Sequence, residues 1–345
     1  MSAARKTARK SVNLALQGRG AHSAFTWGVL DRLLEDGRIR IEAISGTSAG
    51  AMNAVVVADG LVSGGEDAAR AKLAKFWKAV SEAGKSSPIK RHPIDVFMGN
   101  WSLDNSPSYL FFDLFTRLAS PYDLNPLNVN PLKDILESVV DFGVVRSCDD
   151  MKVFISATNV ETGRVEVFDR HRLTCDMVLA SACLPFMFQA VEIGGVPYWD
   201  GGYMGNPVLF PFYRGCASRD VVIVQINPVH RAGVPRTARE ILNRVNEITF
   251  NASLLRDFRA IDFVSRLLED GKLDPEQYKH VLVHRIDAEE EIKPLGASSK
   301  MNAEWAFLQH LFEIGHGAAG RWLDRHFDDL GTTSTVDLRA MFQGT

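Results

Sequence analysis

Short apolar runs alternate with amphipathic stretches along most of the chain. Residues 12–16, 41–46 and 220–227 are compact apolar runs that predict buried strands. The stretch that begins at Ala24 and stops at Gly37 carries its apolar residues on one helical face. An alternation of strands and helices predicts an α/β fold of three layers, with a central, mostly parallel sheet flanked by helices.

Other elements follow from the same patterns. Two strand pairs, 152–158 with 164–168 and 191–193 with 196–199, are separated by turn residues that predict hairpins. A late strand is expected at 280–286. Helices are expected at 66–83, 132–140, 174–182, 236–270 and 302–327, the last one interrupted near residues 315–320 by its glycines.

Residues 86–131 differ from the rest of the chain. Six prolines divide them, and seven aromatic residues lie between Phe97 and Tyr122. This pattern predicts an irregular insertion with one short helix near 109–118. Core packing is one role for these aromatics, and an apolar lid over a binding site is the other, with Trp101, Phe111 and Phe112 as its contacts.

Composition excludes several classes of protein. The formal net charge of −3 argues against a general nucleic-acid binder. The four cysteines have neither zinc-site nor disulfide-framework spacing, which predicts reduced thiols in a cytoplasmic protein. No apolar run reaches the roughly 18 residues of a membrane span. The basic residues 1–10 are predicted to form a disordered tail, with transient contact to an anionic membrane surface as the alternative.

The most informative motif follows the second predicted strand. Gly46-Thr47-Ser48-Ala49-Gly50 joins that strand to an alanine-rich helix, with Ser48 at the apex of the turn. A nucleophilic serine on a sharp strand-to-helix turn needs neighbours without bulk, which explains Gly46 and Gly50. The alternative reading is an ordinary glycine- and serine-rich loop.

A second glycine loop, Gly18-Arg19-Gly20-Ala21, follows the first strand. A dinucleotide site is not favoured, because Ser23 takes the place of the third glycine of that motif. Loops from adjacent parallel strands leave the sheet at the same edge. One loop would then supply a nucleophile and the other backbone N–H groups for an oxyanion, as acyl transfer requires.

Ser48 needs a base, since an unassisted hydroxyl is a weak nucleophile. Asp200, which precedes Gly201 and Gly202, ends a hairpin strand on a tight turn and is the favoured candidate. Partial burial beside Tyr198 and Trp199 would raise its pKa toward that of a useful base. A Ser–Asp–His triad is the alternative, and the chain order permits His230, His284 or His316.

Together these motifs resemble the patatin-like phospholipases. The Gly18–Ala21 loop, the Ser48 elbow and Asp200-Gly201-Gly202 occur in that family's order, and residues 181–186 also fit. The resemblance spans roughly residues 12–208. It implies a Ser48–Asp200 dyad without histidine that cleaves lipid acyl esters through an acyl-enzyme, with the Gly18–Gly20 amides holding the oxyanion. It implies no cofactor and no metal.

The resemblance also implies a domain organisation. Residues 11–215 would be the catalytic domain with its insertion at 86–131, and residues 216–345 an extension that completes the sheet and adds helices. The protein would be cytoplasmic or peripheral at a membrane, with a lipid or acyl ester as its partner.

The glycine loop departs from the family pattern G-G-G-x-[RK]-G. Arg19 replaces a glycine, His22 the basic residue and Ser23 the last glycine. Arg19 must find room for its side chain, and it could place a charge near a lipid head group. These changes keep a third hypothesis open, that of a lipid-binding module without activity.

Overall fold

The structure, a computed structural model, describes residues 9–296 and 298–343, and the predicted basic tail therefore falls largely outside the described residues. In the described chain, eight strands form one sheet in the order β5-β6-β3-β2-β1-β7-β8, with β4 paired to β3. The strands are β1 Lys10–Leu16, β2 Ile39–Gly46, β3 Lys152–Asn159, β4 Val165–Asp169, β5 Val191–Ile193, β6 Val196–Asp200, β7 Asp220–Val224 and β8 Leu282–Ile286.

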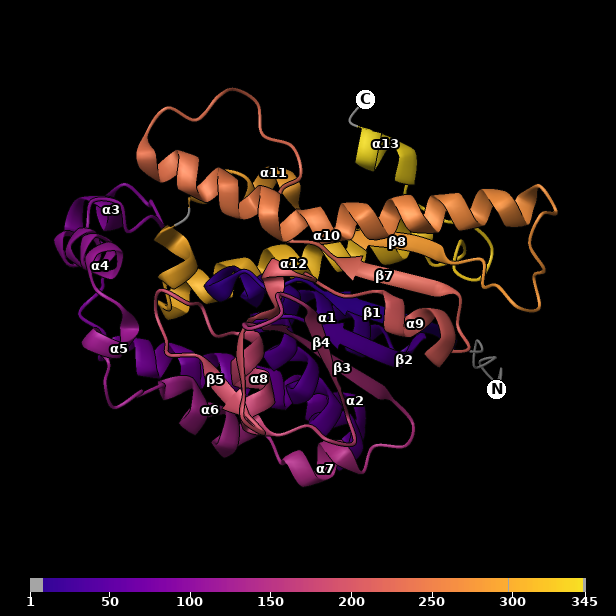
Figure 1. Cartoon of the computed structure of the whole chain (residues 1–345), viewed down its shortest axis with the longest axis horizontal. Coiled ribbons are helices and arrows are strands. Elements are labelled where there is room, and N and C mark those ends of the chain that lie inside the picture. The colour runs from indigo at the N-terminus through magenta and orange to yellow at the C-terminus, as the bar shows by residue number, and fades with distance from the viewer. Residues whose placement is uncertain (1–8, 297, 344–345) are drawn as a thin grey trace, which may run out of the picture.

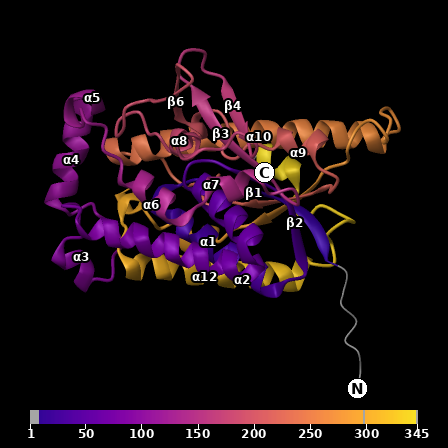
Figure 2. The same cartoon turned by 90° about the horizontal axis from the view of Figure 1, so that it is seen from below.

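Helices cover both faces of this sheet, so the predicted three-layer α/β fold is confirmed (Figures 1 and 2). The longer helices are α1 Ala24–Asp36, α2 Ala49–Lys85, α4 Pro107–Leu118, α6 Pro131–Val139, α10 Ala238–Glu269 and α12 Trp305–His326. The shorter ones are α3 Pro93–Phe97, α5 Pro121–Leu124, α7 Phe142–Arg146, α8 Cys175–Ser181, α9 Phe210–Gly215, α11 Glu289–Ile292 and α13 Leu338–Gln343. Three 3-10 turns occur at η1 Gly20–Ser23, η2 Gly201–Tyr203 and η3 Ser298–Met301.

Alternation along the central strands assigns each helix to a face. Val12, Leu14 and Leu16 of β1 join the core formed with α1, α2 and α12, while Ala15 joins the opposite core with α9 and α10. Neighbouring side chains of a strand point to opposite faces, so one apolar strand serves two cores. The sheet is therefore buried on both sides.

The central strands are parallel and the β3–β6 hairpin region is antiparallel. β1 pairs in parallel with β2 and β7, β2 with β3, and β7 with β8. β3 pairs antiparallel with β4 and β6, and β5 with β6. This matches the predicted mostly parallel sheet with hairpins.

The expected break in the last long helix is wrong, because α12 runs without interruption through the glycines. These glycines instead permit close packing. A Cβ on Gly315 would lie 2.0 Å from the Phe25 carbonyl oxygen of α1. A Cβ on Gly28 of α1 would lie equally close, 2.0 Å, to the Phe312 carbonyl oxygen of α12. Periodicity within one helix gives no sign of a partner helix that needs glycine at the crossing.

The insertion contains more helix than predicted, since α3, α4 and α5 each begin at a proline that follows a capping residue. Ser106 and Ser120 cap α4 and α5 by accepting hydrogen bonds from backbone N–H groups. α3, α4 and α5 project at the same end of the molecule as the first turns of α10 (Figures 1 and 2). No helix among the described residues is long and apolar enough to cross a lipid bilayer.

Candidate functional site

Strand register brings three separate loops to one edge of the sheet. Leu16, the last residue of β1, pairs with Gly46, the last residue of β2, and Gly46 pairs in turn with Ile155 of β3. Two residues further along β3, Ala157 pairs with Asp200 at the end of β6. The glycine loop, the serine turn and the aspartate turn therefore leave the sheet side by side.

Ser48 occupies a strained turn between β2 and α2. Its φ of 56° and ψ of −128° lie outside the regions that residues with a Cβ favour. The Ser48 N–H donates a hydrogen bond to Ser181 Oγ at 2.9 Å, which anchors this turn to α8. A Cβ on Gly46 would lie 2.5 Å from the Gly50 carbonyl oxygen, so the turn requires the small neighbours that the motif provides.

Asp200 is buried next to this serine. Its side chain accepts a hydrogen bond from Ser48 and another, at 2.7 Å, from the Gly202 N–H. Burial raises the pKa of Asp200 to about 6, although both hydrogen bonds act in the opposite direction. The predicted rise in pKa through burial is thus confirmed. A carboxylate with a pKa near 6 is ionised at neutral pH and is a better base than a free aspartate.

The glycine loop lies directly against the serine turn. A Cβ on Gly18 would lie 2.3 Å from the Thr47 carbonyl oxygen and 2.5 Å from the Ser48 Cβ. Asn206 Oδ1 accepts a hydrogen bond from the Gly18 N–H at 2.8 Å, and Asn206 Nδ2 donates one to the Gly18 carbonyl at 3.2 Å. Only a glycine fits at this contact, and its backbone is held by Asn206 and by Asn227, whose Nδ2 also donates to the Gly18 carbonyl at 3.3 Å.

The amides of this loop are not equivalent. The N–H of Gly18 is bonded to Asn206, and that of Arg19 donates to Ser23 Oγ at 3.1 Å. Among the described residues, the N–H groups of Gly20 and Ala21 have no hydrogen-bond acceptor. The donors available to a ligand in this loop are therefore those of Gly20 and Ala21.

The Arg19 side chain does not reach toward a lipid head group, so that expectation is wrong. Its guanidinium is buried, and it donates to the Ile226 carbonyl at 3.0 Å and to Glu247 Oε1 at 2.9 Å. Burial lowers the pKa of Arg19 to about 10, which leaves the side chain charged at neutral pH. The Arg19 side chain extends toward α10, the helix that carries Glu247.

His22 does not replace the missing basic residue of the loop. It is fully buried, and its Nε2 lies 2.8 Å from Ser299 Oγ. Burial, together with the nearby charges of Arg19 and Lys300, holds the pKa of His22 well below its usual value. The imidazole is therefore neutral at physiological pH and supplies no cation.

The histidines proposed for a triad make other contacts. His284 Nε2 lies 2.9 Å from Asp220 at the start of β7, toward the sheet edge opposite Ser48. His316 Nε2 lies 3.2 Å from Glu35, and His230 is exposed. The titratable side chain that interacts with Ser48 is that of Asp200.

Several polar residues of the site were not assigned a role from the sequence. Ser181 lies in a segment that matched the family pattern, but nothing in that pattern pointed to the Ser48 N–H. Asn206 bonds the N–H and the carbonyl of Gly18. Gln17, which precedes the glycine loop, accepts hydrogen bonds from the Ile226 and Asn227 N–H groups through its Oε1. A single sequence carries no signal for such long-range pairs.

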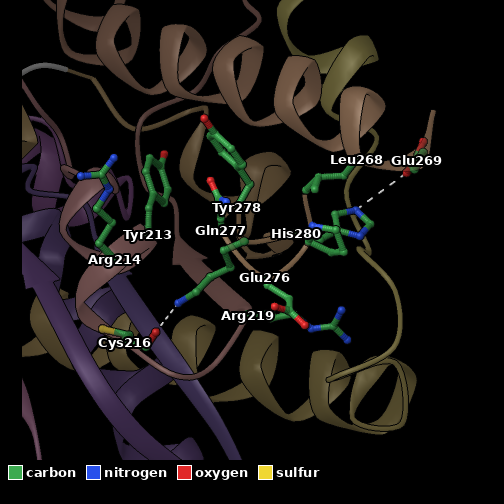
Figure 3. A pocket seen from close by; sticks show the side chains of 12 residues that line it. Tyr213, Arg214, Cys216, Arg219, Leu268, Glu269, Glu276, Gln277, Tyr278 and His280 are labelled. Atoms are coloured by element: carbon green, nitrogen blue, oxygen red, sulfur yellow. Dashed lines mark hydrogen bonds and ion pairs between the residues drawn. The ribbon is translucent and has the colours of Figure 1, made fainter. Parts of the chain in front are cut away.

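The largest features outside the serine site are a hollow near α9 and the charged groups around it. Among the described residues, no group of three or more His, Cys, Asp or Glu side chains could hold a metal ion. A hollow of about 660 Å³ lies between the end of α9 and the loop that follows α10 (Figure 3). Its lining includes Tyr213, Cys216, Tyr278 and Lys279, and the Lys279 ammonium group donates to the carbonyls of Phe212 and Ser218. None of the residues of the serine site lines this hollow.

Comparison with known proteins gives a family match and distant structural similarities. A family model described as Patatin-like phospholipase matches residues 14–213. VipD from Legionella pneumophila is similar at 15% identity with a TM-score of 0.41, over 93% of this chain and 68% of that one. ExoU from the type III secretion system of Pseudomonas aeruginosa, solved in complex with SpcU, is similar at 14% identity with a TM-score of 0.30, over 91% of this chain and 53% of that one. No curated protein matches the chain.

Proposed function

The chain belongs to the patatin-like phospholipase family, and from this premise we propose that it is a serine acyl-ester hydrolase acting on lipids. Ser48 is the nucleophile, Asp200 the general base, and the Gly20 and Ala21 N–H groups the oxyanion donors. The observation that carries the proposal is the placement of Ser48, on a strained strand-to-helix turn, next to the buried carboxylate of Asp200.

The proposed reaction has two halves. Ser48 Oγ attacks the ester carbonyl carbon while Asp200 accepts the hydroxyl proton, and the carbonyl oxygen becomes an oxyanion. Collapse of this intermediate breaks the bond to the alcohol oxygen, which takes the proton from Asp200 and leaves as lysolipid or alcohol. A water molecule then attacks the acyl-enzyme carbonyl carbon through its oxygen, while Asp200 accepts a proton from that water. The fatty acid leaves, and the proton returns to Ser48.

Electrostatics support a dyad that works without histidine. Cys183 and Tyr203 lie near Asp200, and burial raises the pKa of each to about 12, so neither carries a charge at neutral pH. Neither Cys183 nor Tyr203 therefore places a negative charge next to Asp200 or competes with it for the Ser48 proton. Oxyanion donors of this kind each contribute on the order of 100-fold to turnover.

The test compares Ser48→Ala with the parent enzyme on p-nitrophenyl butyrate and on phospholipid vesicles. We expect turnover to fall by about 10⁴-fold or more with the melting temperature retained. Ser147→Ala, in an exposed turn, is the matched control and is expected to keep full activity. Undiminished hydrolysis by Ser48→Ala would overturn the proposal.

Labelling with a fluorophosphonate separates the alternatives. A hydrolase is labelled at Ser48, and Asp200→Asn slows the labelling. Binding to vesicles without label or turnover would favour a lipid-binding module instead. Loss of activity on changing His230, His284 or His316 to alanine, with the fold intact, would favour a triad.

A further inference from the structure

Arg19 and Glu247 form a fully buried ion pair beneath the glycine loop. Arg19 Nη2 lies 2.9 Å from Glu247 Oε1, and the two side chains are 1% and 0% exposed. Arg19 belongs to the loop that follows β1, whereas Glu247 lies on α10, beyond the residues 14–213 that the family model matches. The partner of a loop residue is thus supplied by the C-terminal part of the chain.

The pair is part of a larger cluster of charges. Arg231 Nε lies 2.7 Å from Glu247 Oε2, and Arg244 Nη1 lies 3.4 Å from the same oxygen. Burial alone would raise the pKa of Glu247, but hydrogen bonding to Arg231 and the charge of Arg19 keep it below its usual value. Glu247 is therefore ionised, and it is the carboxylate that Arg19 contacts. An isolated buried guanidinium would be strongly unfavourable.

The Arg19 side chain and the neighbouring Gly20 are both packed closely against other parts of the chain. Arg19 Nη1 donates to the Ile226 carbonyl at 3.0 Å, so the guanidinium is fixed at both ends. On the other side, a Cβ on Gly20 would lie 2.7 Å from the Lys300 carbonyl oxygen, and Gly20 has a φ of 55°. The loop is held between these contacts, and within the described part of the chain its N–H groups without an acceptor are those of Gly20 and Ala21.

We propose that Glu247 is a positioning residue for ester hydrolysis, which acts through Arg19 to hold the Gly20 and Ala21 N–H groups in the loop that packs, through Gly18, against the Ser48 turn. This inference rests on the proposed function of the Ser48 site. Loss of the Glu247 carboxylate leaves Arg19 buried without its charged partner, and the loop must move to bring the guanidinium toward water. The displaced N–H groups would then no longer meet the oxyanion.

A double-mutant cycle tests this coupling. Glu247→Gln is expected to lower kcat on p-nitrophenyl butyrate by about 100-fold with little change in KM, the scale of a lost oxyanion donor. Arg19→Gly removes the buried cation and should cost less than tenfold. In the double variant the fully buried guanidinium is gone, and Arg231 and Arg244, which also contact Glu247, are partly exposed to water. The activity of the double variant should therefore return to that of Arg19→Gly. Glu247→Asp should recover part of the loss.

Asp262→Asn is the matched control, because Asp262 lies on the same helix and contacts Arg266 and Arg339 away from the glycine loop. It should keep the parent kcat. Each rate is normalised to active sites counted by fluorophosphonate labelling, so a variant that merely folds poorly keeps its kcat per site. A Glu247→Gln enzyme with unchanged kcat per site would overturn the proposal. A double variant no more active than Glu247→Gln would overturn it as well.

Hydrogen exchange of the peptide covering residues 17–24 gives a readout independent of activity. We expect faster exchange in Glu247→Gln than in the parent, and exchange at the parent rate in Asp262→Asn. If Ser48→Ala retains activity, the proposed function fails, but exchange in these variants still reports on the loop. Equal exchange in the parent and in Glu247→Gln would contradict the positioning role.

Discussion

Asn206 bonds both polar backbone groups of Gly18: its Oδ1 accepts from the N–H at 2.8 Å, and its Nδ2 donates to the carbonyl at 3.2 Å. Gly18 in turn contacts the Ser48 turn so closely that no Cβ fits. Asn206 thus helps to fix the distance between the glycine loop and the serine, together with Asn227, which also donates to the Gly18 carbonyl. Asn206 and Gly18 are both buried.

Asn206→Asp should therefore impair catalysis more than folding. The change keeps an acceptor for the Gly18 N–H, but it places a carboxylate oxygen against the Gly18 carbonyl and a negative charge near the oxyanion. We expect kcat to fall by about 100-fold, as for loss of an oxyanion donor. Asn130→Asp is the control, since Asn130 caps α6 through Oδ1 alone and aspartate caps equally well. Equal effects of the two changes would contradict this role.

The pKa of Asp200 predicts the acid limb of the pH profile. The base must be ionised in the free enzyme, and its pKa is about 6. We expect kcat/KM to rise about tenfold per pH unit below pH 6 and to level off above about pH 7. Stopped assays with p-nitrophenyl butyrate between pH 4 and 8 measure this. A profile still flat at pH 4.5 would rule out Asp200 as the base.

The same shift predicts how stability depends on pH. Because folding raises the pKa of Asp200, the folded state binds its proton more tightly than the unfolded state. The stability that this gives is complete below the unfolded value of 3.8 and is lost as pH rises to about 6. Asp200→Asn should therefore raise the melting temperature at pH 8 more than at pH 4 while removing activity. A destabilisation confined to pH 8 would contradict the sign.

Ser181 accepts the Ser48 N–H and should support the strained turn. Ser181→Ala leaves that N–H without its acceptor, at a cost of about 1–3 kcal/mol in the free energy of unfolding. We also expect kcat to fall severalfold, because the position of Ser48 is no longer fixed. Ser45→Ala removes a buried hydroxyl bonded to the Val208 carbonyl and serves as the control. It should lower stability similarly and leave kcat unchanged; a fall in kcat in both variants would assign the effect to stability alone.

The aromatic residues of the insertion divide into two groups. Trp101 packs 5.1 Å from the Phe307 ring, with Arg91 over its face, so Trp101→Ala should lower the melting temperature by several degrees. Phe97 and Phe111 are 90% and 63% exposed. Changing both to serine should leave the melting temperature unchanged and reduce hydrolysis of long-chain lipid in vesicles more than hydrolysis of p-nitrophenyl butyrate.

The separation between the two groups is what this comparison tests. Large exposed apolar side chains are typical of contact surfaces, and a lipid substrate is the partner that the proposed function implies. Equal losses on soluble ester and vesicle lipid in the Phe97 and Phe111 variant would contradict a lipid contact. An unchanged melting temperature in Trp101→Ala would contradict its packing role.

Local sequence patterns predicted the layers of the fold and the segments that carry Gly18, Ser48 and Asp200. Apolar runs of strand length and a 3.6-residue period are local properties, so the strands and most helices could be predicted. The Ser48 turn and the Asp200 turn carry glycines because their geometry demands small residues within a few positions. A local steric requirement of this kind appears as glycines at neighbouring positions, so it can be recognised from the sequence alone.

Contacts between residues far apart in the chain could not be predicted from local patterns. Arg19 was expected to point toward a head group, but it is buried against Glu247, 228 residues away. The glycines of α12 look like a break, yet they permit contact with α1. Asn206 bonds Gly18, and Ser181 bonds the Ser48 N–H. No local sequence pattern predicts these hydrogen bonds. Burial, charge pairing and close packing arise only when distant segments meet, and they set the direction of the Arg19 side chain and the pKa of Asp200.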